Sequence, residues 1–298
     1  MEERYPEVEE LYRQYYGRRR LRWLDKMRSD KPKVNLILFV ATFLSTFFAG
    51  WLPRHSVTEG LWYSTAIISI LLAHEMGHYL MCRRHGIRAT LPYFIPFPIP
   101  GNPFGTLGAV IRMESRIPSR KALFDVAVAG PLAGLVVTLP CIYYGIQLSE
   151  VVDLNRVEGV ATLGESFLFA QISKLAKGDL AANQDILLHP LAFAGWAGLF
   201  VTALNLLPIG QLDGGHIVYA LIGRHHRIVA LVALAGFVLV CVFVYPGWFL
   251  LIVLIFWFGY QHPPTLDERP LDRKRFALGI ITLILFLLSF TPRPFQFG

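Results

Sequence analysis

The chain reads His74-Glu75-Met76-Gly77-His78 in the middle of an apolar run from Leu61 to Cys82. On a helix, this spacing places the two histidines one turn apart on the same face. Such a pair can bind zinc, and the glutamate between them can act as general base to a metal-bound water. These three side chains are the only acidic or basic ones in the run. Ionisable groups in a hydrophobic span are costly, so the pattern predicts both a membrane helix and a functional site.

The composition predicts a membrane protein. Of 298 residues, 54% are hydrophobic and 16% are charged, whereas a soluble domain carries about 25% charged residues. The first apolar run begins at Val34, behind 33 charge-rich residues. That stretch is too long for the start of a secretory signal, so the run is predicted to be an uncleaved span. The three cysteines lie in or at the ends of apolar runs, which argues against a disulfide framework.

The apolar runs predict an all-α polytopic membrane protein with about six to seven transmembrane helices. The fifth and sixth runs are separated by Pro246-Gly247, which we interpret as a tight turn rather than a kink. The seven runs are residues 34–51, 61–82, 122–148, 190–207, 228–244, 248–260 and 276–290.

The basic residues predict how these spans are oriented. With the N-terminus in the cytoplasm and seven spans, 23 of the 28 Lys and Arg residues lie on the cytoplasmic side and five lie outside. The positive-inside rule favours this asymmetry. It also explains the net charge of +7 without a nucleic-acid partner. The predicted location is a prokaryotic plasma membrane, on the basis of compactness alone.

Three regions are predicted. Residues 1–33 are a cytoplasmic basic segment, which either orients the chain or also contacts anionic lipid. Residues 34–291 form the multi-span domain, and residues 292–298 are a short tail. Within the domain, the outside segment 149–188 is acidic. Its apolar residues recur at helical spacing, which predicts an interfacial amphipathic helix; they are Leu163, Phe167, Leu168, Ile172 and Leu175.

A zinc site needs a third protein ligand, and Asp213 is the best candidate. It is the only acidic residue between Asp185 and Asp267, in the helix-breaking stretch 205–215, whose sequence is NLLPIGQLDGG. A helix that is broken at membrane depth is found where its backbone is enclosed by protein or faces a water-filled cavity. The predicted topology brings Glu75 and Asp213 to similar depth on the cytoplasmic side. The alternatives are a helix-capping role for Asp213, and His216 or Cys82 as the ligand.

The paired motifs HEMGH and NLLPIGQLDGG resemble those of the site-2 proteases, which are intramembrane zinc metalloproteases. Residues 104–113 (FGTLGAVIRM) and 120–131 (RKALFDVAVAGP) are similar to that family's linker into its third core span. The resemblance covers residues 67–221, about half of the chain. The outside segment has 40 residues and is too short for the PDZ domain of larger members. Neither a PDZ domain nor a nucleotide-sensing domain is expected here.

The resemblance implies a role for each matching residue. His74, His78 and Asp213 would hold one zinc ion per chain, and Glu75 would carry protons. Asn205 would position the substrate or stabilise the oxyanion. The stretch with Gly105 and Gly108 resembles a membrane-associated β-hairpin between the second and third spans, whose edge would position an extended substrate.

The sequence thus predicts an intramembrane zinc endopeptidase with its site toward the cytoplasm. It would cut single-span or multi-span membrane proteins within or next to a transmembrane segment, in a lipid bilayer. The alternative is a metal-ion or proton transporter, because His, Glu and Asp in spans also mark ion pathways. A member that binds helices without cutting is disfavoured by the intact motifs. Histidines outside them, including His85, His226 and His262, are expected to need no role.

Overall fold

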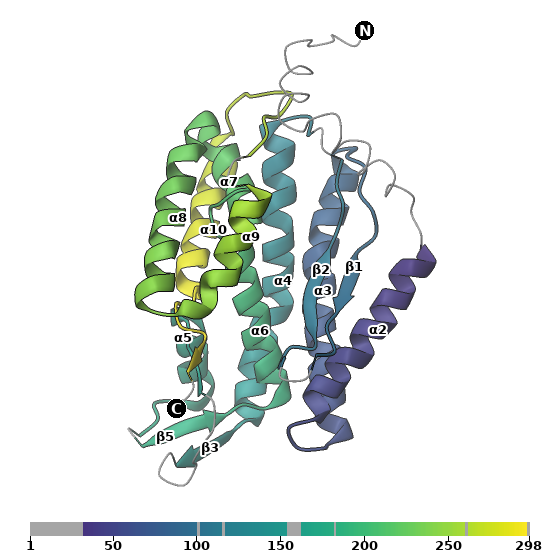
Figure 1. Cartoon of the computed structure of the whole chain (residues 1–298), viewed down its shortest axis with the longest axis vertical. Helices are drawn as coiled ribbons and strands as arrows, with labels where there is room; N and C mark the ends of the chain where they lie inside the picture. Colours follow the sequence, from purple (N-terminus) through teal and green to yellow (C-terminus); the bar gives the residue numbers. More distant parts are fainter. Residues whose placement is uncertain are drawn as a thin grey trace.

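A computed structural model of the chain describes residues 32–99, 102–114, 117–153, 162–181, 183–259 and 262–296. Long helices run roughly side by side, and short strands lie along their flank and at one end (Figure 1). The predicted basic segment 1–33 falls outside the described residues except for its last two. The helices are α2 (Pro32–Trp51), α3 (Val57–Arg84), α4 (Arg120–Leu148), α5 (Phe167–Lys177), α6 (Pro190–Asn205), α7 (Asp213–Ile222), α8 (His226–Phe243), α9 (Phe249–Phe258) and α10 (Arg273–Ser289).

The helices α3, α4 and α10 each begin at a capping side chain. Ser56 and Ser119 accept a hydrogen bond from a main-chain amide three residues on, and Asp272 does the same for α10. These caps satisfy amides that have no partner within the helix. The short 3-10 helices η2 (Gly223–His225) and η3 (Pro246–Trp248) precede α8 and α9.

Four helical stretches in the described part are long and apolar enough to cross a bilayer: Pro32–Trp51, Val57–Arg84, Arg120–Leu148 and Asp213–Phe243. Each of the seven predicted apolar runs contains a helix, but α6, α9 and α10 have only 16, 10 and 17 residues. A straight helix needs about 20 residues to span the hydrocarbon core. The structure therefore confirms a helical membrane protein, while the number of spans stays a prediction. Between α8 and α9 the chain reverses direction at the predicted turn (Figure 1).

The helices turn apolar side chains outward. On α2 the buried residues are polar, namely Asn35, Thr42, Ser45 and Thr46, whereas Leu36, Ile37 and Phe48 are exposed. On α8 and α9 many large apolar side chains are also exposed, among them Val232 and Trp257. This arrangement suits a protein whose surroundings are lipid, because lipid chains accept apolar side chains as readily as a protein core does.

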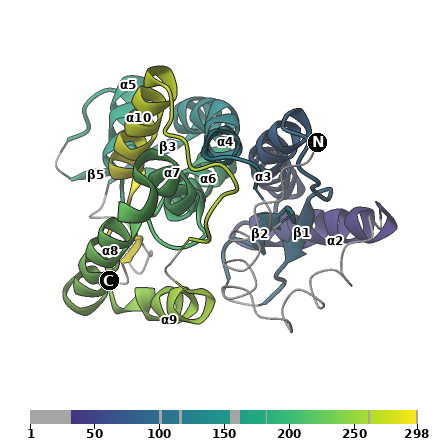
Figure 2. The same ribbon diagram turned by 90° about the horizontal axis from the view of Figure 1, so that it is seen from above.

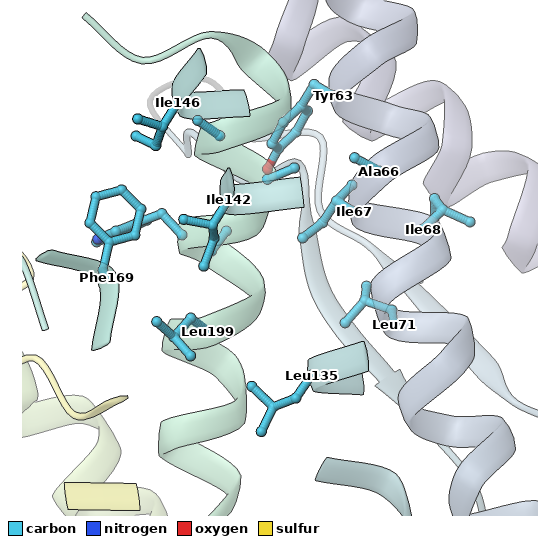
Figure 3. Packing of buried hydrophobic residues seen from close by; sticks show 14 of the residues in the cluster. Tyr63, Ala66, Ile67, Ile68, Leu71, Leu135, Ile142, Ile146, Phe169 and Leu199 are labelled. Atoms are coloured by element: carbon cyan, nitrogen blue, oxygen red, sulfur yellow. The ribbon is translucent and has the colours of Figure 1, made fainter. Parts of the chain in front are cut away.

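The main core lies between α3, α4 and α6 (Figure 3). Tyr63 and Ile67 from α3 meet Ile142 from α4 and Leu199 from α6 in this cluster. Small residues let the helices approach closely. A Cβ atom on Gly145 would lie 2.2 Å from the main-chain nitrogen of Ala192, so any larger side chain there would push α4 and α6 apart.

A two-stranded antiparallel sheet, β1 (Tyr93–Pro96) with β2 (Thr106–Val110), lies between α3 and α4 in the sequence and beside α2 and α3 in space (Figure 2). Its membrane association stays a prediction. Polar contacts join α2 to the residue before each strand: the Asn35 amide donates to the Pro92 carbonyl at 2.8 Å, and the Ser45 hydroxyl donates to the Gly105 carbonyl at 2.6 Å. Gly105 has φ +67°, and a Cβ there would lie 2.7 Å from the Ser45 carbonyl oxygen.

Residues 149–188, which were predicted to lie outside, contain the helix α5. Leu168 and Ile172 pack toward the main core, whereas Phe167 and Leu175 are exposed. Leu163 falls outside α5, because it lies in β4 (Thr162–Leu163), which pairs with β6 (Phe295–Gln296). Strands β3 (Glu150–Asp153) and β5 (Gln184–Leu187) form another antiparallel pair. A position of α5 at the membrane interface stays a prediction.

Candidate metal centre

The motif His74–His78 lies in the C-terminal half of α3, where the helical repeat brings both rings to one face. The two Nε2 atoms are 3.1 Å apart. His74, Glu75 and His78 are 5%, 6% and 6% exposed, so three ionisable side chains are almost completely enclosed. Such groups persist in a protein interior only when they are paired or hold a metal.

Asp213 reaches the same point from the start of α7. The chain leaves α6 at Asn205 and doubles back through Pro208 and Gly210 before α7 begins. This return is tight: a Cβ atom on Gly214 would lie 1.9 Å from the Leu206 carbonyl oxygen. The helix-breaking residues of the motif therefore allow a fold-back that larger residues would block.

The three side chains converge. Oδ2 of Asp213 lies 3.3 Å from Nε2 of His74 and 3.3 Å from Nε2 of His78. One ligand atom from each residue lies within 4.8 Å of the others, which makes this a group that could hold a metal ion. Two imidazole nitrogens and a carboxylate oxygen are a donor set that zinc accepts in catalytic sites.

The surroundings of His78 also fit a metal ligand. Its Nδ1 lies 2.8 Å from the Val126 carbonyl oxygen, which can only accept, so Nδ1 carries the proton. Nε2 is then left with a lone pair facing Asp213, and such outer hydrogen bonds orient metal-binding histidines. Gly130 of α4 keeps this place open, because a Cβ there would lie 2.1 Å from Nε2 of His78. Sequence reasoning did not assign Val126 or Gly130 any role at the site.

Asn205 and Glu75 lie at the same centre. The amide nitrogen of Asn205, the last residue of α6, lies 3.3 Å from Nε2 of His74. The Glu75 carboxylate accepts a hydrogen bond from the main chain of Ile111, just beyond β2. A cavity of about 210 Å³ opens between α3, α4, α7 and this strand. Its lining includes five of the seven predicted site residues, His74, Glu75, His78, Asn205 and Asp213.

The two glycines predicted to position a substrate lie differently. Gly105 packs against α2, as described above, rather than beside the histidines. Gly108 has φ +99° and open space where a Cβ would be. The residues that follow Gly108 line the cavity, namely Ala109, Val110 and Ile111.

The rival ligands take other positions. Cys82 is a fully buried thiol in an apolar cluster. His216 lines the cavity, but its Nδ1 lies 2.6 Å from Nε2 of His262. His226 begins α8 and His262 lies in the segment after α9, where loops and span edges were expected. Both are buried and hydrogen-bonded, and the expectation that they need no role stays a prediction. Their contacts join distant parts of the chain and leave no local sequence pattern.

In comparisons with known proteins, the matching family and the similar proteins agree with one another. A profile described as Peptidase family M50 matches residues 62–244. "Probable zinc metalloprotease EGY2, chloroplastic" from Arabidopsis thaliana is 33% identical over 244 residues, which are 80% of this chain and 43% of that protein. The protein of the same name from Oryza sativa subsp. japonica is 32% identical over 269 residues, 88% of this chain and 47% of the relative. "Probable zinc metalloprotease EGY1, chloroplastic" from Arabidopsis thaliana is 33% identical over 236 residues, which are 76% of this chain and 42% of that protein.

The chain spans less than half the length of these relatives. No solved structure matches it. The relatives' names place them in chloroplasts, which conflicts with the predicted prokaryotic plasma membrane. That prediction depended on compactness, a property that does not specify a membrane, and it does not stand.

Proposed function

Because the chain belongs to peptidase family M50, as its resemblance to the site-2 proteases indicated, we propose that it is a membrane-embedded zinc endopeptidase that hydrolyses a peptide bond within or next to the transmembrane segment of another membrane protein. The observation that carries the proposal is the convergence of His74, His78 and Asp213 beside Glu75 in one buried cavity. The zinc in the relatives' names supports the choice of metal. Residues 34–291 would form the protease domain.

His74, His78 and Asp213 would hold the zinc. When bound, zinc supplies a Lewis acid that polarises a peptide carbonyl and makes water a stronger nucleophile near neutral pH. Glu75 is placed to hold the proton that water gives up and to pass it to the amine that leaves, because it neighbours His74 on the same helix and lines the cavity. The Asn205 amide beside His74 can donate a hydrogen bond to the oxygen on which negative charge develops.

The edge of β2 suits a substrate that must be unwound. A peptide bond in a helix is protected, since its carbonyl and amide groups are hydrogen-bonded within the helix. β2 pairs with β1 along one edge, and the residue that follows it, Ile111, reaches the Glu75 carboxylate. An extended segment added to this strand would have its main-chain groups satisfied while it lies beside the cavity. The partners proposed are therefore single-span or multi-span membrane proteins within the bilayer.

A transporter is not favoured. The family match covers both motifs, and the glutamate between the histidines makes a main-chain hydrogen bond beside the ligand cluster. In a transporter this carboxylate would be a ligand, and its removal would weaken metal binding.

The test measures zinc content and cleavage on the purified chain in lipid. The variants are Glu75→Gln, Asp213→Ala and, as a matched surface control, the exposed Asp179→Asn. The substrates are a panel of single-span proteins with helix-breaking residues in their spans. We expect about one zinc in wild type, Glu75→Gln and the control, much less in Asp213→Ala, and cleavage by wild type and the control alone. Loss of zinc from Glu75→Gln, with no cleavage by any form, would instead support the transporter.

The proposed orientation puts the cavity on the cytoplasmic side, where water can enter. Gln211 lines the cavity and is exposed, so Gln211→Cys reports on access. In sealed vesicles of known orientation, a membrane-impermeant thiol reagent should label this variant from the cytoplasmic side above the level of the unsubstituted chain. Labelling from the other side alone would reverse the assigned orientation.

A further inference from the structure

Three histidines form a hydrogen-bonded cluster that reaches the cavity at His216. They come from α7 (His216), the start of α8 (His226) and the segment after α9 (His262). His226 and His262 are buried, whereas His216 is partly buried and lines the cavity together with the candidate metal ligands. His216 follows Asp213 by three residues, so both lie on the same side of α7.

Fixed acceptors at the ends of the cluster decide where its protons lie. Nδ1 of His262 lies 2.5 Å from the Pro263 carbonyl oxygen. A carbonyl only accepts, so Nδ1 of His262 carries a proton. In a neutral imidazole the other nitrogen is then an acceptor. Nε2 of His262 therefore accepts from Nδ1 of His216, 2.6 Å away. His216 is left with a bare Nε2.

A second set of contacts holds His262 in place. Nδ1 of His226 lies 2.9 Å from the Gly223 carbonyl oxygen, so it also carries the proton. Nε2 of His226 then accepts from the main-chain amide of His262 at 3.2 Å, as an amide requires. The Tyr219 ring stacks on the His262 ring at a centroid distance of 4.3 Å and an interplanar angle of 23°. Burial lowers the pKa of His262 well below its ordinary value, which favours the neutral ring.

An unwound substrate needs hydrogen-bond acceptors, and an unprotonated Nε2 is one. Its main-chain amides lose their helical acceptors, and an amide that is buried in a protein site without a partner is costly. Among the polar side chains that line the cavity, His74, His78 and Asp213 would hold the metal, Glu75 would hold the proton, and Asn205 would act as a donor. Gln211 can also accept a hydrogen bond, but its side chain is exposed. His216 provides an acceptor on a side chain that is held in place.

We propose that His216 is a further catalytic residue whose Nε2 accepts a hydrogen bond from a substrate main-chain amide next to the scissile bond, and that His262 is the positioning residue that holds His216 in this tautomer. This rests on the proposed function. Without an acceptor at its Nδ1, His216 would be free to adopt the opposite tautomer, with Nε2 protonated. It would then present a donor to the substrate amide, so that two N–H groups would face each other.

The test separates the tautomer from mere packing. Four variants are compared with wild type in lipid: His216→Ala, His216→Gln, His262→Gln and His262→Leu. A glutamine amide oxygen can replace the lost Nε2 acceptor, whereas leucine fills space without one. We expect kcat/KM to fall by about tenfold to a hundredfold in His216→Ala and His262→Leu, as for loss of one buried hydrogen bond. The two glutamine variants should recover most of the activity, and all four should keep their zinc.

Nitrogen-15 NMR of histidine-labelled protein reads the tautomer directly, with the His216 signals assigned by their loss in His216→Ala. We expect Nδ1 protonated and Nε2 bare in wild type and His262→Gln, and a loss of that preference in His262→Leu. A protonated Nε2 in wild type, full activity in His216→Ala, or equal activity of His262→Leu and His262→Gln would each overturn the proposal. If wild type cuts no substrate, the proposed function fails and the catalytic role of His216 with it, whereas the tautomer result still tests the role of His262.

Discussion

Gly130 illustrates how a residue without a side chain can define a metal site. It belongs to α4, yet it lies against Nε2 of His78 from α3. Removing a side chain from one helix creates room for the ligands of another. The sequence predicts the two histidines well, because their spacing alone puts them on one helical face. It gives no sign that Gly130 faces them, since that depends on how α3 and α4 pack.

We therefore expect Gly130→Ala to impair the centre without unfolding the protein. The new Cβ would lie 2.1 Å from Nε2 of His78, so the ring must move. Displacing a ligand in this way should weaken zinc binding by about tenfold to a hundredfold, measured by competition with a metal indicator. Gly236→Ala is the matched control, because nothing lies within 4 Å of a Cβ there. Equal zinc affinity of the two variants would contradict this account of Gly130.

At His262, the lowered pKa makes stability depend on pH. Its folded-state pKa lies well below the ordinary value, chiefly because the ring is buried and then because His216 lies beside it. The unfolded chain therefore binds the proton more readily below about pH 6.5. The neighbouring groups from the packed elements are His216 and Tyr219 of α7 and His226 of α8, with Glu268 bonded to the Tyr219 hydroxyl.

Stability from His262 is present above its unfolded pKa and falls as the pH drops below it. We expect the thermal midpoint in detergent to decrease between pH 7 and pH 5, and His262→Gln to flatten this decrease. His225→Gln, at an exposed neighbour of His226, should keep the wild-type dependence. If His262→Gln and wild type lose stability in parallel, other groups cause the effect.

At the scale of elements, Arg120 connects three segments that frame the site. Its side chain is buried. Nε and Nη2 donate to the Ala220 carbonyl at 3.1 and 2.8 Å, and Nη1 donates to the Glu268 carbonyl at 3.0 Å. Ala220 lies in the last turn of α7, where unpaired carbonyls and the helix dipole favour a cation. The start of α4 thus holds the end of the helix that begins with Asp213.

Arg120→Lys should therefore destabilise the protein even though the charge is kept. A lysine ammonium is a point charge and does not reproduce the planar fork of donors. We expect a loss of about 2 kcal/mol, as for a hydrogen bond between a charged and a neutral group. It is measurable as a lower denaturation midpoint in mixed micelles. The exposed neighbour provides the control, since Lys121→Ala should change little; an equal loss in both variants would contradict the prediction.

The helices could be predicted from the sequence, while most of the strands could not. Apolar runs such as 122–148 predict helices because every main-chain group in a bilayer must be bonded within its own segment. The pair β3–β5 is four residues long on each side, and such short stretches carry too little alternation to stand out. The boundary of α5 was set too early for a similar reason, since Leu163 fits the helical spacing but belongs to a strand.

At the scale of the whole molecule, the candidate metal joins helices that are distant in sequence. Two of the candidate ligands belong to α3 and one to α7, and α4, α5 and α6 lie between them in the sequence. Sequence reasoning anticipated this meeting, because the predicted topology put both motifs at one depth. It did not reveal the histidine cluster, whose members meet only through the packing of α7 and α8 with the segment that contains His262.

Removing the metal should loosen the whole fold. A ligand that binds only the folded state stabilises it by about 2.7 kcal/mol at a hundred times its dissociation constant. We expect a chelator to lower the thermal midpoint of the purified chain and zinc to restore it. In Asp213→Ala neither treatment should move the midpoint by a comparable amount. If the chelator leaves the thermal midpoint of the wild type unchanged, the three candidate ligands do not bind a metal.

The inward-facing polar stripe of α2 also limits how this protein can be rebuilt or recombined. Asn35 and Ser45 donate to Pro92 and Gly105, the residues just before β1 and β2, rather than to another helix. A chimaera that takes α2 alone from a distant relative would leave these groups, or the carbonyls that accept from them, buried without partners. We therefore expect a successful graft to exchange α2, α3 and the β1–β2 sheet together, as residues 32–114.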